Sequence, residues 1–153
     1  MPIASSLWWV VEGKLAGGRK PENEEILELK ELGIGGIVSM MDDPSNLDKY
    51  QAAGLAYKWL PTAGGTPPSM THMFELKRFV DEQNALGNAV LVHCSSGRRR
   101  TGTALAAYFI LSECSCDDAL QKVLTANPDA DLREEQINFL KYQIFISPNK
   151  PIE

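Results

Sequence analysis

Residues 89–92 read Ala-Val-Leu-Val, an apolar run with no polar side chain on either face. A strand with this pattern is buried on both sides, as the central strands of parallel sheets are. A loop rich in serine and arginine follows the run, and then a small, apolar segment at 101–111. This segment indicates a helix packed against the sheet. A strand, a short loop and a buried helix in this order are typical of α/β domains.

Strand-like and helix-like segments alternate along the rest of the chain. We expect strands at 7–11, 34–41 and 55–60, residues 14–17 pairing with the first strand, and helices at 21–32, 47–53, 69–86, 116–126 and 132–146. This alternation predicts an α/β fold with a central, largely parallel sheet of about four to five strands flanked by helices. We expect one domain over residues 1–146 and a flexible tail over residues 147–153, which contain two prolines.

Composition narrows the classes of function. The net charge of −5 disfavours binding to nucleic acid and to anionic lipid, and no apolar run is long enough to span a bilayer. Three cysteines and the absence of a secretory leader favour a reducing, cytoplasmic compartment. With only two histidines, the cysteines lack the partners of a zinc site, so we expect no metal and no other cofactor. We expect the chain to be monomeric.

The loop after the apolar run gathers positive charge beside one thiol. Between Cys94 and Arg100 lie Ser95, Ser96, Gly97, Arg98 and Arg99. Five residues are enough to curl the backbone so that its N–H groups point inward at the start of a helix, which makes an anion-binding nest. Gly97 tolerates the positive φ that such a curl needs, and the guanidinium of Arg100 matches two oxygens of a phosphate.

The N–H groups and arginines of this loop also act electrostatically on the sulfur of Cys94. Backbone donors, neighbouring cations and the hydroxyl of Thr101 all favour the thiolate, which is the nucleophilic form. A thiolate below a bound phosphoryl group is placed for in-line attack, and the loop donors can stabilise the charge that develops on the phosphoryl oxygens. The residues therefore predict a cysteinyl-phosphate mechanism.

The segment 93–102, His-Cys-Ser-Ser-Gly-Arg-Arg-Arg-Thr-Gly, resembles the signature of cysteine-dependent protein tyrosine phosphatases. The short chain is similar to the compact dual-specificity branch of that superfamily, and the resemblance extends over nearly the whole chain except the tail. It implies that Cys94 is the nucleophile, Arg100 the clamp on the phosphate and Thr101 the hydroxyl that eases departure of the thiolate. It also implies that His93 tunes the cysteine and that Gln136 helps to position the hydrolytic water.

One part of the family pattern is missing. The resemblance places a general-acid aspartate in the loop 61–68, but that loop contains no acid, and Ala63 or Gly64 stands at the expected position. Three explanations are open. The acid comes from elsewhere, with Asp42 and Asp43 as candidates; the substrates need little protonation; or Ala63 replaces a natural aspartate.

Several functions fit this pattern. The first is a metal-independent phosphatase acting on phosphotyrosine, and on phosphoserine or phosphothreonine if the pocket is shallow. The second is a phosphatase for inositol phosphates or other polyanionic phosphoesters, for which Arg98 and Arg99 would widen an electropositive mouth. The third is a weakly catalytic phosphate-binding module, suggested by the missing aspartate. Arg98 and Arg99 equally fit an ordinary surface role in pairing with acidic residues. The partner is in each case a phosphorylated protein or a small phosphoester.

Overall fold

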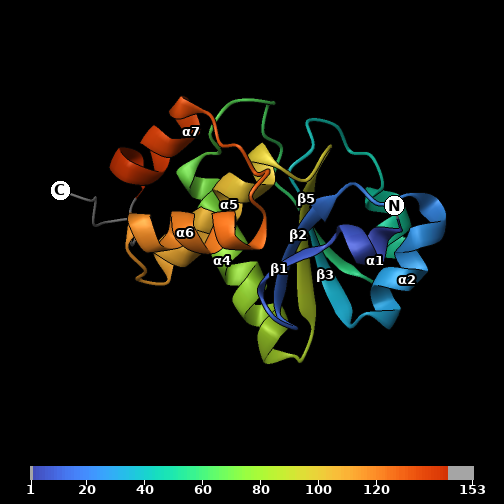
Figure 1. Ribbon diagram of the computed structural model, residues 1–153. Coiled ribbons are helices and arrows are strands. Elements are labelled where there is room, and N and C mark those ends of the chain that lie inside the picture. The colour runs from blue at the N-terminus through green and yellow to red at the C-terminus, as the bar shows by residue number, and fades with distance from the viewer. Residues whose placement is uncertain (1, 145–153) are drawn as a thin grey trace.

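The computed structural model describes residues 2–144 and places one sheet between two layers of helices (Figure 1). The strands are β1 (Trp8–Val11), β2 (Leu15–Arg19), β3 (Ile34–Ser39), β4 (Ala56–Trp59) and β5 (Ala89–Cys94), in the spatial order β1-β2-β5-β3-β4. Only β1 is antiparallel to its neighbour; the other four strands are parallel. The predicted α/β class and largely parallel sheet are confirmed.

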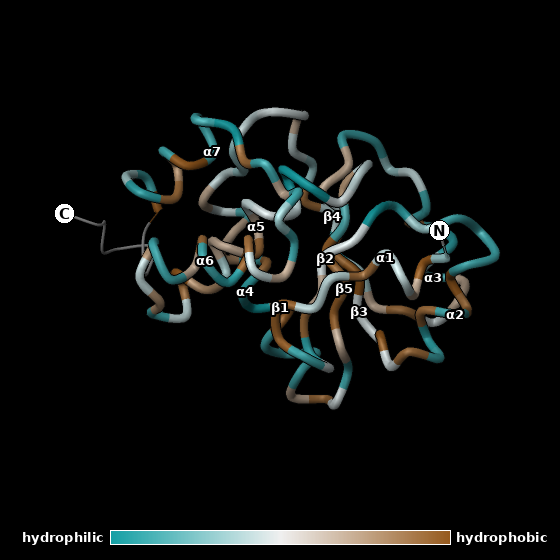
Figure 2. The backbone as a smooth tube through the Cα atoms, in the orientation of Figure 1, coloured by the Kyte–Doolittle hydropathy of each residue, from teal (hydrophilic) through white to brown (hydrophobic). Residues whose placement is uncertain are grey.

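The central strand is the one that the apolar run predicted. All six residues of β5 are buried, and β2 and β3 lie on either side of it. The apolar residues gather on the central strands and on the helix that follows β5, as Figure 2 shows. The carboxyl ends of β2, β5, β3 and β4 meet at one edge of the sheet, where α/β proteins bind ligands.

Two apolar cores lie on the two faces of the sheet. The larger core lies beneath α4 (Met70–Ala85), α5 (Arg99–Leu111) and α6 (Cys116–Ala126), and the shorter helices α1 (Ile3–Ser6), α2 (Ile26–Glu31) and α3 (Leu47–Ala52) cover the other face. A 3₁₀ turn, η1 (Asn23–Glu25), leads into α2. Ten residues of α5 are buried, so this helix is fixed between the sheet and its neighbours.

Most helices match the sequence expectation, and the exceptions lie near the two ends of the chain. The short helix α1 was not expected. The helix expected at 132–146 is instead α7 (Glu134–Asn138), which continues as a π-helical turn, η2 (Phe139–Gln143). The expected tail and the end of that helix lie outside the described residues, so the proposed domain boundary stays a prediction. Within the described part of the chain, no helix has the length and apolarity needed to cross a membrane.

Candidate active site

The loop between β5 and α5 forms a tight cradle at the carboxyl edge of the sheet. Gly97 has a φ of 73°, and a Cβ on this residue would overlap the backbone carbonyl of Gly18 at the end of the neighbouring strand. The indole Nε1 of Trp8 donates to the carbonyl oxygen of Gly97 over 3.1 Å. The backbone amide of Lys20 donates to the carbonyl oxygen of Ser95 over 3.3 Å. Contacts from β1 and from the end of β2 therefore fix the loop.

Cys94 lies at the base of this cradle as the last residue of β5. It is 2 % exposed, and the hydroxyl of Thr101 in the first turn of α5 lies 3.1 Å from its Sγ. The hydroxyl can donate a hydrogen bond to the sulfur. The structure thus brings together the two residues expected to form and release the cysteinyl intermediate.

A small pocket lies above Cys94. Its volume is about 110 Å³, and its lining comes from two loops: Gly64, Gly65, Cys94, Ser96, Arg98, Arg99 and Arg100. Since one water molecule occupies about 30 Å³ of liquid, this space equals roughly four waters. It has room for a phosphoryl group and little more, so the remainder of any phosphoester must lie outside it.

Arg100 reaches across the pocket to the neighbouring loops. Its Nη1 donates to the carbonyl oxygens of Met40 and Thr62 over 3.2 and 2.8 Å and to Oδ1 of Asp42 over 2.8 Å. The Arg100 side chain is only 13 % exposed, whereas that of Asp42 is 59 % exposed. A bound phosphate would therefore compete with the Asp42 carboxylate for the same guanidinium.

A hydrogen-bonded chain behind the cradle holds the imidazole of His93. His93 is fully buried, and burial lowers its pKa to about 4, so the ring is neutral at physiological pH. Its Nε2 lies 2.8 Å from the hydroxyl of Tyr50, and its Nδ1 lies 3.3 Å from the Cys94 carbonyl oxygen. A carbonyl can only accept, which assigns the proton to Nδ1 and leaves Nε2 to accept from Tyr50.

The sequence does not predict the far end of this hydrogen-bonded network, which is formed by Tyr50 and Asn46. The amide nitrogen of Asn46 donates to the Tyr50 hydroxyl over 3.2 Å and to the Pro21 carbonyl over 2.9 Å. Burial raises the pKa of Tyr50 to about 12, so its hydroxyl keeps the proton it donates to His93. Tyr50 and Asn46 are 43 and 47 positions before His93, and the sequence carries no local signal that joins them.

Arg98 and Arg99 turn toward the loop after α6 although they also line the pocket. Arg98 Nε donates to the Asp129 carbonyl over 2.7 Å, and Arg99 Nε donates to the Asp131 carbonyl over 3.0 Å. Both guanidinium groups also reach the Asp131 carboxylate, at 3.5 and 2.7 Å. Arg99 in turn lowers the pKa of Asp131. The two arginines thus make the surface ion pairs that their residue type alone would predict.

The remaining candidates occupy different positions. Gln136 is fully buried; its Oε1 accepts from the amide of Arg133 over 2.9 Å, and its Nε2 lies 3.5 Å from the Thr66 carbonyl. It therefore contacts the loop 61–68 and does not line the pocket above Cys94. Asp43 caps the local turn through Ser45, and those hydrogen bonds lower its pKa.

The loop 61–68 brings no acid to the pocket. Ala63 is exposed, and its carbonyl accepts from the amide and hydroxyl of Thr66 over 3.2 and 2.7 Å. Gly64 and Gly65 face Cys94 instead. Among the residues that contact Arg100, Asp42 supplies the carboxylate. Asp42 is therefore better placed than Asp43 to act on a group bound in the cradle.

Known proteins share this architecture. A solved structure described as Tk-PTP in the active form superimposes with a TM-score of 0.81 at 29% identity, covering 88% of this chain and 93% of that one. The mouse phosphatidylglycerophosphatase and protein-tyrosine phosphatase 1 is 30% identical over 116 residues, which are 71% of this chain and 60% of the mouse protein. The Arabidopsis thaliana phosphatidylglycerophosphate phosphatase PTPMT2 is 29% identical over 110 residues, 67% of this chain and 47% of that protein.

The chain thus spans about half of the length of these curated relatives. The family described as Swiss Army Knife protein, DSP-PTPase phosphatase domain, matches residues 4–143, which contain the whole cradle and every strand of the sheet. This chain belongs to that family of phosphatase domains.

Proposed function

We propose that this protein hydrolyses phosphomonoesters through a phosphocysteine formed at Cys94. The observation that carries the proposal is the placement of a buried thiol at the base of a fixed loop, 3.1 Å from the hydroxyl of Thr101. The Cys94 thiolate attacks phosphorus, the P–O bond to the leaving group breaks, and the leaving oxygen takes a proton. Water then attacks the phosphocysteine, which releases inorganic phosphate and restores the thiolate.

Asp42 is the proposed source of that proton. In the free protein its carboxylate pairs with Arg100. A phosphoryl group that takes over Arg100 would release this carboxylate next to the reacting centre, where it takes a proton from the bound phosphomonoester or from solvent. The resulting carboxyl then protonates the leaving oxygen, which restores the carboxylate. General acid catalysis contributes about 10²–10⁴-fold, so this step separates an enzyme from a weak binding module.

Gln136 is proposed as a positioning residue in this scheme. Its contacts with Arg133 and with the Thr66 carbonyl hold the loop 61–68 beside the pocket. That loop supplies Gly64 and Gly65, which line the pocket above Cys94 without placing a side chain in it.

The small pocket defines the substrate only as a phosphomonoester whose leaving group projects outward. A phosphotyrosine side chain fits this description, and phosphoserine or phosphothreonine fits it if the pocket is shallow. A small polyanionic phosphoester is the second candidate, favoured by relatives that carry the name phosphatidylglycerophosphatase.

Turnover of para-nitrophenyl phosphate with and without EDTA tests the proposal, with the Cys94→Ser variant as the comparison. We expect turnover that resists EDTA and is abolished in the variant. Phosphate binding without turnover would support the binding module, and activity that survives Cys94→Ser would refute the phosphocysteine route.

A further inference from the structure

We propose that a second anionic group of the substrate binds in the larger pocket beside the cradle, between Lys20 and Lys49. This inference rests on the proposed function and narrows it to one substrate class. That class is phosphomonoesters that carry a second phosphate or phosphodiester. The first phosphoryl group would lie over Cys94 and the second in this pocket, which is called the lysine pocket below.

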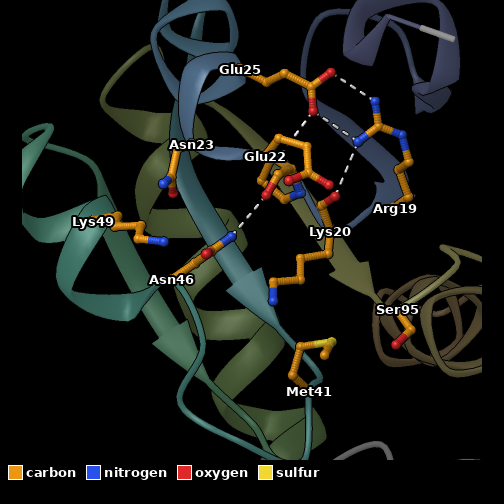
Figure 3. A pocket seen from close by; sticks show the side chains of 10 residues that line it. Arg19, Lys20, Glu22, Asn23, Glu25, Met41, Asn46, Lys49 and Ser95 are labelled. Carbon is orange, nitrogen blue, oxygen red and sulfur yellow. Dashed lines mark hydrogen bonds and ion pairs between the residues drawn. The ribbon is translucent and has the colours of Figure 1, made fainter.

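The lysine pocket adjoins the cradle directly. Its volume is about 690 Å³, and its wall next to the cradle is formed by Ser95 and Met41 (Figure 3). Arg19 is the strand neighbour of Cys94 in the sheet, and the amide of the next residue, Lys20, donates to the Ser95 carbonyl. The lysine pocket thus begins at Ser95, the residue that follows Cys94. It provides space for a second group that the small pocket above Cys94 cannot hold.

Its charge favours an anion. Figure 3 shows the side chains of Lys20 and Lys49 extending into the pocket, with Asn46 between them. Neither ammonium group forms a salt bridge with any residue in the range 2–144. The Arg19 guanidinium is occupied by Glu25, at 2.8–2.9 Å, so the other charged residues that line the pocket are Lys20, Lys49 and Glu22. Asp43 lies outside this lining but within range of the charge of Lys20.

The charge of Lys20 acts at the catalytic edge. Together with Arg100, it helps to lower the pKa values of His93 and Asp43, although burial and the Ser45 hydrogen bonds are the larger causes. An anion bridging from the cradle to Lys20 would therefore lie between two cations, Arg100 and Lys20.

The opposite rim of the cradle is less suited to this role. Arg98 and Arg99 also line the pocket above Cys94, but both bind the Asp131 carboxylate. A second phosphate there would have to displace an ion pair, whereas the two lysines make no ion pair with any residue that the structure describes. The lysine pocket is therefore the favoured binding site for the second anion, which would bind to Lys20 and Lys49.

The same chemistry can come from a soluble bisphosphate or from a phospholipid head group. A mostly apolar groove formed by Ile26, Leu27, Ala52 and Ala53 continues from the lysine pocket and shares Asn23 and Lys49 with it. Leu27 is 64 % exposed in this groove. An acyl chain of a lipid substrate would lie along it, so a change at Leu27 distinguishes the two sources.

Binding is measured by calorimetry in the Cys94→Ser background, with inositol 5-phosphate and inositol 1,5-bisphosphate as probes. Hydrogen bonds to charged groups give about tenfold or more in affinity, so we expect the bisphosphate to bind at least tenfold tighter. Lys20→Gln with Lys49→Gln should abolish this preference, and the corresponding arginine variants should keep it. Lys14→Gln with Lys141→Gln removes the same charge from two exposed lysines that line neither pocket, and it should keep the preference too.

A parent protein that binds both probes equally, or a preference that survives the loss of Lys20 and Lys49, would overturn the lysine pocket. Turnover of para-nitrophenyl phosphate by the unmutated chain is measured in parallel. Turnover without the preference refutes the lysine pocket alone, and the preference without turnover refutes the catalytic proposal alone.

A second assay distinguishes a lipid ligand from a soluble one. It measures how fast the active chain hydrolyses phosphatidylinositol 5-phosphate in phosphatidylcholine vesicles and inositol 1,5-bisphosphate in solution. A loss on Leu27→Ser that is confined to the vesicle substrate identifies a lipid. Equal turnover by the parent and Leu27→Ser identifies a soluble ligand. Either result supports binding of a second anionic group in the lysine pocket. Turnover of both probes that is unchanged by Lys20→Gln with Lys49→Gln contradicts it.

Discussion

The guanidinium of Arg100 and the carboxylate of Asp42 lie 2.8 Å apart at the mouth of the pocket above Cys94. Arg100 is the group expected to bind phosphate, and Asp42 is the carboxylate that holds it in the free protein. In the proposed mechanism, the phosphoryl group of the substrate takes over Arg100 and breaks this ion pair. The exchange would connect recognition of the phosphate with release of the Asp42 carboxylate, the proposed carrier of the leaving-group proton.

The Asp42→Asn variant should change binding and catalysis in opposite directions. Without the competing carboxylate, inorganic phosphate should inhibit at a lower concentration. Without the acid, kcat should fall by about 10²–10⁴-fold for aryl phosphates with poor leaving groups and much less for activated ones. A series of aryl phosphates gives the dependence of kcat on leaving-group pKa, which should steepen in the variant.

Asp43→Asn is the control for Asp42, since Asp43 is hydrogen-bonded to Ser45. An unchanged dependence on leaving-group pKa in Asp42→Asn would remove Asp42 from the mechanism. The alternative that the substrates need little protonation would then account for the missing loop aspartate.

Arg98 and Arg99 are expected to act on stability more than on substrate choice. Because both bind the 129–131 segment, their double change to alanine removes a link between α5 and the loop after α6. We expect a small loss in unfolding free energy, since the ion pairs with Asp131 are exposed to solvent. The values of kcat/KM for inositol 5-phosphate and inositol 1,5-bisphosphate should fall by similar factors. A selective loss on the bisphosphate would instead assign these arginines to polyanion recognition.

The cradle should depend on the absence of a side chain at Gly97. Gly97→Ala places a methyl group against the Gly18 carbonyl and also requires a positive φ, which costs about 1–2 kcal/mol for an L-residue. Gly13 has the same φ of 73° but no atom near its Cβ position, so Gly13→Ala measures the conformational cost alone. Thermal unfolding should show a larger loss for Gly97→Ala, together with loss of phosphatase turnover. Equal losses in the two variants would mean that the close approach to Gly18 is unimportant.

The buried His93 predicts a pH dependence of stability. Its pKa is about 4 in the folded protein and 6.5 in the unfolded chain, so the unfolded state binds the proton more readily. The contribution is fully present above pH 6.5 and is lost as the pH falls toward 4, by about 3–4 kcal/mol in total at 1.4 kcal/mol for each pH unit. Urea unfolding at pH 7, 5.5 and 4.5 measures this slope. The slope should be smaller in His93→Gln, and an equal slope in both proteins would show that His93 is not its source.

The parts of the fold that were predicted correctly are set by local patterns. The apolar run at β5 and the small residues of α5 are buried whichever neighbours they meet, so the strand, loop and helix follow from the sequence. By contrast, α1 is four residues long and lacks a side-chain cap. Its Ile3 is buried in the second core, which only the folded chain creates.

The candidate site divides in the same way. Cys94, Gly97, Arg100 and Thr101 lie within eight residues, so one local motif was enough to predict that they come together. The partners of that loop come from distant segments: Tyr50 and Asn46 behind His93, and Asp131 beside Arg98 and Arg99. Asn46 has a φ of 72°, and no local sequence pattern predicts this backbone conformation. Such contacts depend on the sheet order, and so they could not be read from the sequence alone.

The central claim is that phosphate passes through the sulfur of Cys94, and trapping the intermediate tests it most directly. The protein is mixed with excess para-nitrophenyl phosphate, quenched in acid during turnover, digested and analysed by mass spectrometry. The account predicts the mass of one phosphoryl group on the peptide that contains Cys94 and none on the peptides that contain Cys114 and Cys116. Turnover with the phosphoryl group on another residue, or persisting in Cys94→Ser, would contradict it.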